Sequence, residues 1–534
     1  RLYVRPLLLW QTWVALAVTP SGSALTPTSP LRRLATPLTE RFAREWRSPE
    51  DNVKELEQQP TSFSQMLNGD ELHEECGVFG IYAPGEDVAR LTFFGLYALQ
   101  HRGQESAGIA TTDGDEIHAH THLGLVSQAF REDDLRMLTG HIAVGHARYS
   151  TTGSNSSCNA GPMIAPSSIG RIAVSHNGNL VNSAALRHEL EMRGEYFEST
   201  TDSEVLTRLI ATSPGETIVE KIRAAMPKME GAYSLAVMTT DRLLAVRDPF
   251  GVRPLCVGRF GSHWVVSSES CALMTIGAEY VREVEPGEIV EIQGEEITSH
   301  IGLSARPAMC LLEFIYFARP DSLITNQRIH LIRQRMGQEL AKEQPVDADI
   351  VVGLPDSAIP AAIGYAMQSG IPYTEALVKN RYIGRTFIQP DQRLREVGVS
   401  LKFNALPEVL EGKRVVLIDD TIVRGTTSRP IVQLLRQAGA KEVHMRVHAP
   451  PIMWPCYLGV DLAKREELIA ANMTVPEIGR HIGADSIAYL SLPGLLNAID
   501  VPTGGFCTGC LTGRYPVRID QLQSKFALEA LAVS

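Results

Sequence analysis

Two adjacent carboxylates, Asp419 and Asp420, stand between an apolar run and a loop of small polar residues. The run Val415–Ile418 is too short for a helix but suits a central strand of a parallel sheet. In the loop Arg424–Ser428, glycine and hydroxyl side chains leave backbone N–H groups free to bind an anion. This order predicts a strand that brings two carboxylates and a phosphate cradle to one end of a sheet.

A helix should follow the cradle. Ser428 is a suitable N-cap and Pro430 suits a first helical turn, so the helix N-terminus would face a bound phosphate. The alternative interpretation is an Asp-rich turn between a strand and a helix, which is common in α/β folds.

Cys507 and Cys510 form a Cys-x-x-Cys pair, which has the chemistry of a metal or cluster site, and the family resemblance described below adds Cys310 and Cys456 as two further thiolates. Zinc and a [4Fe–4S] cluster both accept four thiolates. Eight cysteines in 534 residues do not suggest a disulfide framework, so we expect a reducing, cytoplasmic compartment. The remaining cysteines outside the N-terminal motif, Cys158, Cys256 and Cys271, are interpreted as core or loop residues.

The segment 379–402 holds six basic residues and two acidic ones in a chain whose net charge is −11. It also contains Gly384 and Pro390, which indicate a loop. We expect this loop to close over an anionic ligand and exclude water. The alternative is a solvated charged face. The residues expected to contact the ligand are Lys379, Arg381, Arg393 and Lys402.

Composition and patterning indicate two folded parts that must position these groups. Hydrophobic residues make up 44% of the chain and charged residues 21%, which is enough to bury substantial cores. The acidic balance argues against a general nucleic-acid binder. Short apolar strands joined by turns between residues 76 and 305 predict a strand-rich α+β domain. From residue 306 strands and helices alternate, which predicts a mostly parallel α/β domain to about residue 515, followed by a tail, 516–534.

Residues 1–75 lie ahead of the first patterned strand. The apolar run Leu7–Val18 has flanking arginines, as in a secretory or transit segment, but it is too short to cross a bilayer. The first methionine is Met66. We interpret residues 1–65 as non-native upstream sequence, and a plastid transit segment is the alternative. No membrane span is expected elsewhere.

Cys76 by itself is typical of a buried strand cysteine. Its surroundings change that interpretation, because the sequence resembles the N-terminal-nucleophile glutamine amidotransferases. The motifs that carry the resemblance are Cys76–Gly80, Gln100–Gly108, Gly145–Gly153, Ser175–Asn179 and Thr201–Glu204. Together with the phosphate cradle, they resemble the glutamine phosphoribosylpyrophosphate amidotransferases, from about residue 74 to about residue 513.

The resemblance implies that Cys76 becomes the mature N-terminus and attacks the glutamine amide. A free α-amine, with an ordinary pKa of about 7.7–8.0, can accept the thiol proton, whereas the amide of an uncut chain cannot. The Asn177 side chain and the Gly178 N–H would stabilise the oxyanion. Arg148 and Asp202 would bind the α-carboxylate and α-ammonium of glutamine, with Arg102 a weaker candidate. His101 and His176 are not assigned catalytic roles, because the base lies at the N-terminus.

The second part resembles the type I phosphoribosyltransferases, whose ligand is 5-phosphoribosyl 1-diphosphate. The resemblance places one Mg²⁺ per subunit near Ser357, Asp419 and Asp420. It also favours the [4Fe–4S] cluster over zinc at Cys310, Cys456, Cys507 and Cys510, in a structural role. The other residues expected to bind the ligand are Thr421, Arg424, Gly425, Thr426, Thr427, Ser428, Lys379 and Lys402.

The expected reaction converts glutamine, phosphoribosyl diphosphate and water into phosphoribosylamine, glutamate and diphosphate, which opens purine synthesis. Ammonia must stay unprotonated on its way between the sites, so we expect a shielded path with Tyr149 as a relay residue. The resemblance also implies feedback by purine nucleotides and a homotetramer. Two alternatives are an amidotransferase for glucosamine phosphate or asparagine, and a non-enzymatic regulator that retains the fold. The phosphate cradle argues against the first, and the intact site residues argue against the second.

Overall fold

The structure is a computed structural model that describes residues 76–150, 152–380, 402–462, 464–501, 505–519 and 528–529. All of them belong to one compact unit, 63–534. Within the described residues, no helix is both long and apolar enough to cross a membrane.

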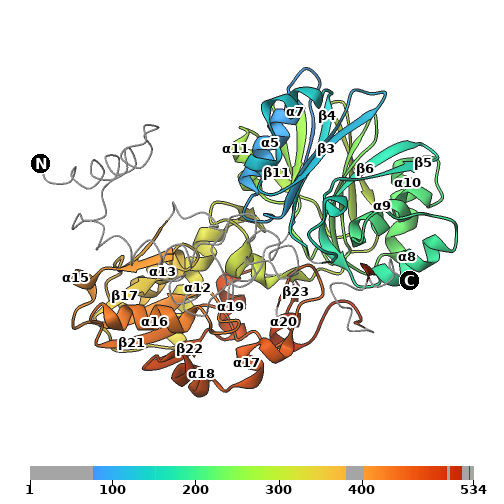
Figure 1. Cartoon of the computed structure of the whole chain (residues 1–534). Helices are drawn as coiled ribbons and strands as arrows, with labels where there is room; N and C mark the ends of the chain where they lie inside the picture. The colour runs from blue at the N-terminus through green and yellow to red at the C-terminus, as the bar shows by residue number, and fades with distance from the viewer. Residues whose placement is uncertain are drawn as a thin grey trace, which may run out of the picture. The chain divides into compact units, whose positions relative to one another are not determined.

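The N-terminal half contains two antiparallel sheets (Figure 1). The first has the strand order β11-β9-β10-β1-β4-β2-β3 and the second the order β13-β12-β8-β7-β6-β5. The strands of the first are β1 (Gly77–Tyr82), β2 (Ser106–Thr112), β3 (Ile117–Leu123), β4 (Ile142–Arg148), β9 (Cys256–Phe260), β10 (His263–Ser267) and β11 (Glu279–Glu283). Those of the second are β5 (Met163–Ser167), β6 (Gly170–Leu180), β7 (Gly231–Met238), β8 (Leu243–Arg247), β12 (Glu288–Gln293) and β13 (Glu296–Ile301).

The two sheets face each other across an apolar core. Val78 and Val144 of the first sheet pack in the same cluster as Ala236 and Leu243 of the second. Because strand side chains alternate, the opposite face of each sheet needs its own cover, and helices supply it. Figure 1 shows α5, α7 and α11 on one side of the sheets and α8, α9 and α10 on the other. The helices are α5 (Val88–Ala98), α6 (Val126–Ala129), α7 (Glu132–Met137), α8 (Ser183–Glu191), α9 (Asp202–Thr212), α10 (Ile218–Ala225) and α11 (Ser270–Thr275).

The C-terminal half contains a four-stranded parallel sheet with the order β17-β20-β21-β22. Val416 and Ile418 of β20 pack in one core cluster, whereas Val415 and Leu417 pack in another, so both faces of the strand are buried. This explains the continuous aliphatic run, which is typical of parallel sheets. The strands are β17 (Ile350–Gly353), β20 (Arg414–Asp419), β21 (Glu442–Val447) and β22 (Ser486–Tyr489). The helices are α12 (Ile329–Glu343), α13 (Ile359–Ser369), α15 (Pro407–Leu410), α16 (Ser428–Gln437), α17 (Ile469–Asn472), α18 (Val475–Ile482), α19 (Leu492–Ile499) and α20 (Gly509–Thr512).

Three short strand pairs complete the described chain. In the pair β14–β23 the strands run parallel and place Cys310 beside Cys507. The pair β18–β19 is antiparallel and closes the base of the basic segment. These strands are β14 (Met309–Cys310), β23 (Phe506–Cys507), β18 (Leu377–Lys379), β19 (Phe403–Ala405), β15 (Leu323–Ile324) and β16 (Gln327–Arg328), and a π-helical turn, η3, spans Glu313–Phe317.

The predicted fold class is confirmed, including β20 as a central parallel strand. The prediction that Ser428 caps the following helix is wrong. Thr427 occupies the cap position, where its side chain does not cap the helix N–H groups, and Ser428 is the first residue of α16. The helix thus begins two residues before Pro430, because Ser428 and Arg429 already adopt the helical conformation.

Candidate active site

Cys76 lies at the start of β1, with only 8% of its surface exposed. The strand register pairs Gly77 with Ala147, which brings the end of β4 alongside the cysteine. The Cys76 thiol donates a hydrogen bond to the Tyr149 carbonyl, with an Sγ–O distance of 3.4 Å. Burial raises the pKa of this thiol to about 11, against the opposing effects of the Tyr149 hydrogen bond and the Arg148 charge. A base must therefore remove its proton before it can act as a nucleophile.

Arg148 is the last residue of β4 and is 4% exposed. Its guanidinium donates to the carbonyls of Thr152 at 3.0 Å and Ser154 at 3.4 Å. Glu105, which the sequence did not single out, lies 4.0 Å from that guanidinium and accepts a 2.8 Å hydrogen bond from the Ser150 N–H. The sequence signal that could have found Glu105 is its place within the Gln100–Gly108 motif.

Asp202 is the first residue of α9, and Thr201 caps that helix by accepting from the Glu204 N–H. One Asp202 carboxylate oxygen accepts a 3.0 Å hydrogen bond from the Leu180 N–H, which ties the helix to β6. Asp202 and Arg148 both act on the Cys76 thiol electrostatically. The structure therefore brings these three predicted residues together.

Asn177 and Gly178 lie on β6. Among the described residues, neither polar atom of the buried Asn177 amide has a hydrogen-bond partner. Gly178 has a φ of 147°, and a Cβ there would lie 2.0 Å from the Ala232 carbonyl oxygen, so only glycine fits. Gly459, from the C-terminal half, packs against Gly178, and the Asn179 side chain donates to the Tyr457 carbonyl at 3.0 Å. A buried amide without a hydrogen-bond partner lowers the stability of the folded chain. Such a group is typical of a site that binds a ligand.

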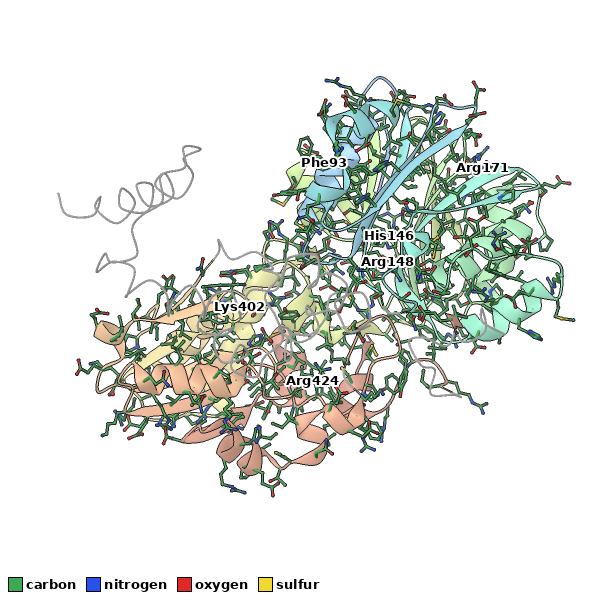
Figure 2. All side chains as sticks on the ribbon, in the orientation of Figure 1. Phe93, His146, Arg148, Arg171, Lys402 and Arg424 are labelled. Atoms are coloured by element: carbon green, nitrogen blue, oxygen red, sulfur yellow. The ribbon has the colours of Figure 1, made fainter. Side chains whose placement is uncertain are left out.

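Two buried histidines lie close to these residues. His176 contacts Ser203, with 3.1 Å between Nδ1 and Oγ, and lies 3.8 Å from Asp202. Figure 2 shows His146 near Arg148, from which it is two residues away on β4. Burial lowers the pKa of His146 to about 3, and Nε2 has no partner among the described atoms. His146 is therefore neutral at physiological pH.

The second site is a pocket of about 370 Å³ at the carboxyl end of the parallel sheet. Asp419 and Asp420 are 5% and 6% exposed. The Asp420 carboxylate accepts hydrogen bonds from the Ser357 hydroxyl and, at 2.8 Å, from the Thr421 hydroxyl. An Asp419 carboxylate oxygen accepts the Asp420 N–H at 2.9 Å. The structure therefore brings the four residues together in one oxygen-rich wall.

The predicted phosphate cradle lines this pocket only in part. Thr427 and Ser428 line it at the N-terminus of α16. Arg424 forms an ion pair with Glu467 at 2.9 Å, and Gly425 has a φ of 77°. Arg424, Gly425 and Thr426 are not among the pocket-lining residues. Figure 2 shows Arg424 and Lys402 in this half of the chain.

The two ends of the predicted basic loop can be located. Lys379 lines the pocket and forms an ion pair with Asp356 at 3.2 Å. Lys402 stands at the start of the returning strand, where its carbonyl accepts the Asn380 N–H at 2.8 Å. Residues 381–401, with Arg381 and Arg393, lie outside the described residues.

The opposite wall of this pocket was not predicted from the sequence. It is formed by the segment 316–320, the buried Arg333 of α12, and His101 from the N-terminal half. Arg333 donates to the carbonyls of Phe314 at 2.9 Å and Ala318 at 2.8 Å. Burial lowers its pKa to about 10, so it remains charged at neutral pH. A short sequence motif could not predict this wall, because its residues come from both halves of the chain.

The four predicted ligand cysteines lie near one another, and three of them lie near the buried Arg253. Cys310 pairs with Cys507 in the β14–β23 register, and Cys510 follows in α20. Arg253 is fully buried, yet the pKa of its guanidinium is raised because Cys310 and Cys456 lie nearby. Among the described residues, no three or more His, Cys, Asp or Glu side chains are arranged to hold a single metal ion.

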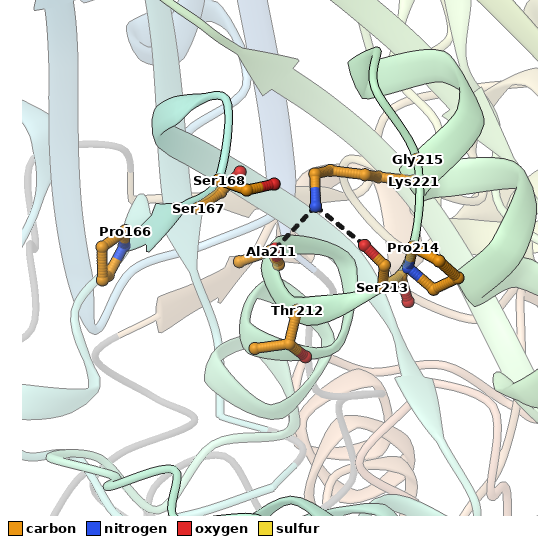
Figure 3. A pocket seen from close by; sticks show the side chains of 9 residues that line it. All are labelled: Pro166, Ser167, Ser168, Ala211, Thr212, Ser213, Pro214, Gly215 and Lys221. Carbon is orange, nitrogen blue, oxygen red and sulfur yellow. Dashed lines mark hydrogen bonds between the residues drawn. The ribbon is translucent and has the colours of Figure 1, made fainter.

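Another hollow, of about 540 Å³, contains none of these predicted residues (Figure 3). Its one charged group is the ammonium of Lys221, which donates to the carbonyls of Ala211 and Ser213 at 3.2 and 2.8 Å. Those carbonyls close the C-terminal end of α9, where a cation is favourable. Lys221 therefore has a structural role.

The fold and the two groups of site residues, around Cys76 and around Asp419, define a class of protein, a glutamine amidotransferase joined to a phosphoribosyltransferase. Residues 146–275 match the family of glutamine amidotransferase domains, and residues 322–449 match the family of phosphoribosyl transferase domains. An amidophosphoribosyltransferase of Synechocystis is 52% identical over 477 residues, covering 87% of this chain and 96% of the relative. The Bacillus subtilis protein of that name is 47% identical over 456 residues, covering 84% and 96%.

Solved structures agree. One, described as the B. subtilis glutamine phosphoribosylpyrophosphate amidotransferase complexed with ADP and GMP, has a TM-score of 0.80 and 46% identity. It covers 85% of this chain and 100% of its own. This chain belongs to the amidophosphoribosyltransferase family, the glutamine phosphoribosylpyrophosphate amidotransferases of purine biosynthesis.

Proposed function

We propose that Cys76 releases ammonia from glutamine and that the Asp419–Asp420 pocket transfers it to C1 of 5-phosphoribosyl 1-diphosphate. The products are phosphoribosylamine, glutamate and diphosphate, and one water is consumed in releasing glutamate. The observation that carries this proposal is the presence, in one chain, of a buried thiol beside Arg148 and a buried pair of carboxylates at the end of a parallel sheet.

The thiol must lose its proton to a base. Cleavage before Cys76 would create an α-amine on the same residue, close enough to accept that proton. The raised pKa of the buried thiol makes such a base necessary. Attack on the glutamine amide would then form a thioester and release ammonia, and water would hydrolyse the thioester.

Asn177 and Gly178 would stabilise the oxyanion formed in both steps. The Asn177 amide is buried and has no partner among the described residues, so it can donate to a developing charge without first giving up another hydrogen bond. Gly178 has no side chain to block approach to its N–H. Preorganised donors of this kind act most strongly where water is excluded.

Arg148 and Asp202 would recognise the two charged groups of glutamine. Arg148 now donates to two backbone carbonyls, which are weaker partners than a carboxylate. Asp202 would accept from the α-ammonium. Tyr149, which is 8% exposed and follows Arg148, would act as a relay residue on the path of ammonia.

In the acceptor pocket, Asp419, Asp420 and the Ser357 hydroxyl would bind Mg²⁺ with the ribose diphosphate. Hard oxygen donors suit this ion, which commonly takes one or two carboxylates and completes its shell with water and substrate phosphates. When bound, Mg²⁺ neutralises the charge that develops on the departing diphosphate. Thr421, Thr427 and Ser428 would donate to the substrate's phosphate and hydroxyl oxygens.

The arms of the basic segment would act on the same ligand. Lys379 lies in the pocket wall, and with Lys402, Arg381 and Arg393 it would close over the diphosphate. Arg424, Gly425 and Thr426 would hold the 5-phosphate through the loop that leads to α16. To bind the phosphate, Arg424 would have to break its ion pair with Glu467.

Cys310, Cys456, Cys507 and Cys510 would bind a structural [4Fe–4S] cluster. Each thiolate binds a different iron in such a cluster, so the four sulfurs stand farther apart than around one zinc ion. What supports this proposal is that Cys310 lies beside Cys507 in the β14–β23 pair and that Cys310, Cys456 and Cys507 all act on the Cys510 thiol electrostatically. Iron and sulfide analysis of anaerobically purified protein tests this, and stoichiometric zinc would overturn it.

Regulation and assembly are proposed from the family. The relative solved with ADP and GMP supports feedback by purine nucleotides, and we propose a homotetramer. A reducing compartment suits exposed or cluster-bound thiols, so we propose the cytoplasm, or a plastid if residues 1–65 are a transit segment.

One experiment tests the central proposal. Purified protein is supplied with phosphoribosyl diphosphate, Mg²⁺ and either glutamine or ammonium, while glutamate release and phosphoribosylamine are measured. The N-terminal sequence of the same sample is determined. Synthesis from both nitrogen sources, with Cys76 at the N-terminus, is expected. Active protein in which Cys76 is preceded by other residues contradicts the nucleophile mechanism.

A further inference from the structure

The carboxylate of Glu269 divides its two oxygens between the halves of the chain. Oε1 contacts His101 Nε2 at 2.6 Å and accepts a hydrogen bond from the Arg102 guanidinium. Oε2 accepts the Arg319 N–H at 2.9 Å and the Ser322 hydroxyl at 2.5 Å from the C-terminal half, and also the neighbouring Cys271 thiol at 3.8 Å. Glu269 immediately precedes α11 and is 1% exposed. One buried group therefore joins a turn of the N-terminal half to a segment of the C-terminal half.

The Oε1 partners lead to the glutamine pocket. They belong to the turn that follows α5, in which Gly103 packs so closely on Ala147 that a Cβ would lie 2.4 Å from its backbone. Two residues later, the Glu105 N–H donates to the Arg148 carbonyl at 3.1 Å. A shift of this turn would therefore move the backbone beside Arg148.

The Oε2 partners lead to the acceptor pocket. Arg319 lines that pocket next to Ala318 and Pro320, and Ser322 follows directly. A second ionic contact runs in parallel, because Arg102 also donates to both carboxylate oxygens of Glu313, at 2.6 and 3.2 Å. Glu313 begins the π-helical turn that leads into the same wall.

The charge on Glu269 is what allows this arrangement. Burial opposes its ionisation, but Arg102 and His101 outweigh burial and hold its pKa well below the usual range. A charged carboxylate can accept from four donors at once, whereas a neutral amide in its place accepts through one oxygen only. Replacement by glutamine would therefore leave donors on one of the two sides unpaired.

We propose that Glu269 is a positioning residue that couples the acceptor wall to the glutamine pocket, so that glutamine is cleaved productively when the acceptor site is ordered. The inference rests on the proposed function, because it assigns a means by which that function avoids wasting glutamine. Glu269 does not touch either substrate. It acts by fixing the His101–Arg102 turn and the Arg319–Ser322 segment relative to each other.

The test compares Glu269→Gln with wild type in three measurements: ammonium-dependent synthesis, glutamate release, and phosphoribosylamine formed per glutamate released. We expect ammonium-dependent synthesis within about threefold of wild type. We expect the yield per glutamate to fall about tenfold, within the usual range of coupling between sites. A residue that only stabilises the fold would lower all activities together and leave this yield unchanged.

Two further variants keep the test decisive. Glu288→Gln removes another buried carboxylate of the N-terminal half, one that pairs with Arg282 and Ser299 and does not line the acceptor pocket. It should leave the yield unchanged. Ser322→Ala keeps the charge of Glu269 and removes one donor on the acceptor side, so it decides the matter if Glu269→Gln does not fold. It should lower the yield in the same direction by a smaller factor.

The outcomes separate this inference from the proposed function. If wild type forms no phosphoribosylamine from ammonium, the proposed function fails. If wild type is active but the yield is unchanged in folded Glu269→Gln, or in Ser322→Ala where the first variant does not fold, the coupling role is refuted. An equal loss of yield in Glu288→Gln also refutes it.

Discussion

The two proposed sites of this chain are built on different principles. The proposed glutamine site holds a neutral thiol, a buried amide without a partner among the described residues and the single charges of Arg148 and Asp202, and every predicted residue in it comes from the N-terminal half. The acceptor pocket is lined by carboxylates, hydroxyls and cations, and one wall carries His101 from the other half. Glutamine needs one counter-charge for each of its two charged groups and donors aligned on its side-chain amide, whereas a substrate with several phosphate charges needs several cations.

The difference explains how the halves depend on each other. The wall of the acceptor pocket contains His101 of the N-terminal half, so the shape of this wall depends on where that half lies. Among the described residues, the C-terminal half contacts the strand of the proposed glutamine site through Gly459 against Gly178 and through the hydrogen bond from Asn179 to the Tyr457 carbonyl. Each substitution below is expected to affect one of the two sites. An effect on both sites would contradict the difference between them.

The largest effect is expected from Cys76→Ala. Without the nucleophile, glutamine-dependent synthesis should fall by at least about 10³-fold, as for other covalent catalysts. Ammonium-dependent synthesis should remain, because the acceptor pocket keeps all its groups. The matched control is Cys158→Ala, an exposed cysteine, which should change neither rate. Loss of both reactions in folded Cys76→Ala would show that the pockets are not chemically separate.

Asn177→Ala should lower the rate of glutamate release by about 10²- to 10³-fold, the usual cost of removing one oxyanion donor. The effect should appear in kcat more than in KM, because the amide acts on the transition state. Ser175→Ala is the control, since it removes another buried polar group from the same strand that has no partner among the described residues. Equal losses in both variants would point to damage of the strand instead.

Asp420→Asn should lower synthesis from either nitrogen source by about 10²-fold, since charge stabilisation at the diphosphate is lost for both. Glutamate release measured without phosphoribosyl diphosphate should stay within about twofold. Asp349→Asn serves as the control at the other end of the parallel sheet, where the carboxylate pairs with Arg414. A selective loss of the glutamine-dependent reaction would contradict the assignment of Asp420 to the acceptor site.

The smallest effect is expected on the free energy of unfolding at acid pH, through His146 beside Arg148. Burial lowers the pKa of His146 to about 3, below the ordinary value of about 6.5. Between these two values the unfolded chain binds a proton that the folded chain does not, so stability is lost as pH falls below about 6.5. The loss is about 1.4 kcal/mol per pH unit. The test is denaturant unfolding of His146→Gln and wild type between pH 7 and 5. As pH falls below about 6.5, the free energy of unfolding of the variant should decrease by about 1.4 kcal/mol per pH unit less than that of wild type.

Local patterns predicted most of the fold. The aliphatic run before Asp419 identified β20, because a strand buried on both faces needs apolar residues at every position. The short apolar strands expected between residues 76 and 305 do not include β3, because its histidines and threonine do not form an apolar pattern. The cap of α16 was misplaced by one residue, because local sequence does not fix helix ends.

Predicted site residues lie together where each belongs to a contiguous motif. Cys76, Arg148 and Asp202 come together as expected, since each sits within a short motif on a strand end or helix start. Glu269 and His101 were not predicted, because their importance depends on contacts between residues 50 or more positions apart. The amount of charge in the sequence does not reveal which charged groups are buried together.

The contact between Gly459 and Gly178 limits how such enzymes can be recombined. The strand that carries Asn177 is backed by a segment that begins at Cys456, in the other half of the chain. A glutaminase domain cut out near residue 305 would lose that backing and expose the strand. A chimera that joins this glutaminase domain to a new acceptor domain would therefore also need a glycine-containing segment that fits against Gly178. The piece of chain to be exchanged is then larger than one domain.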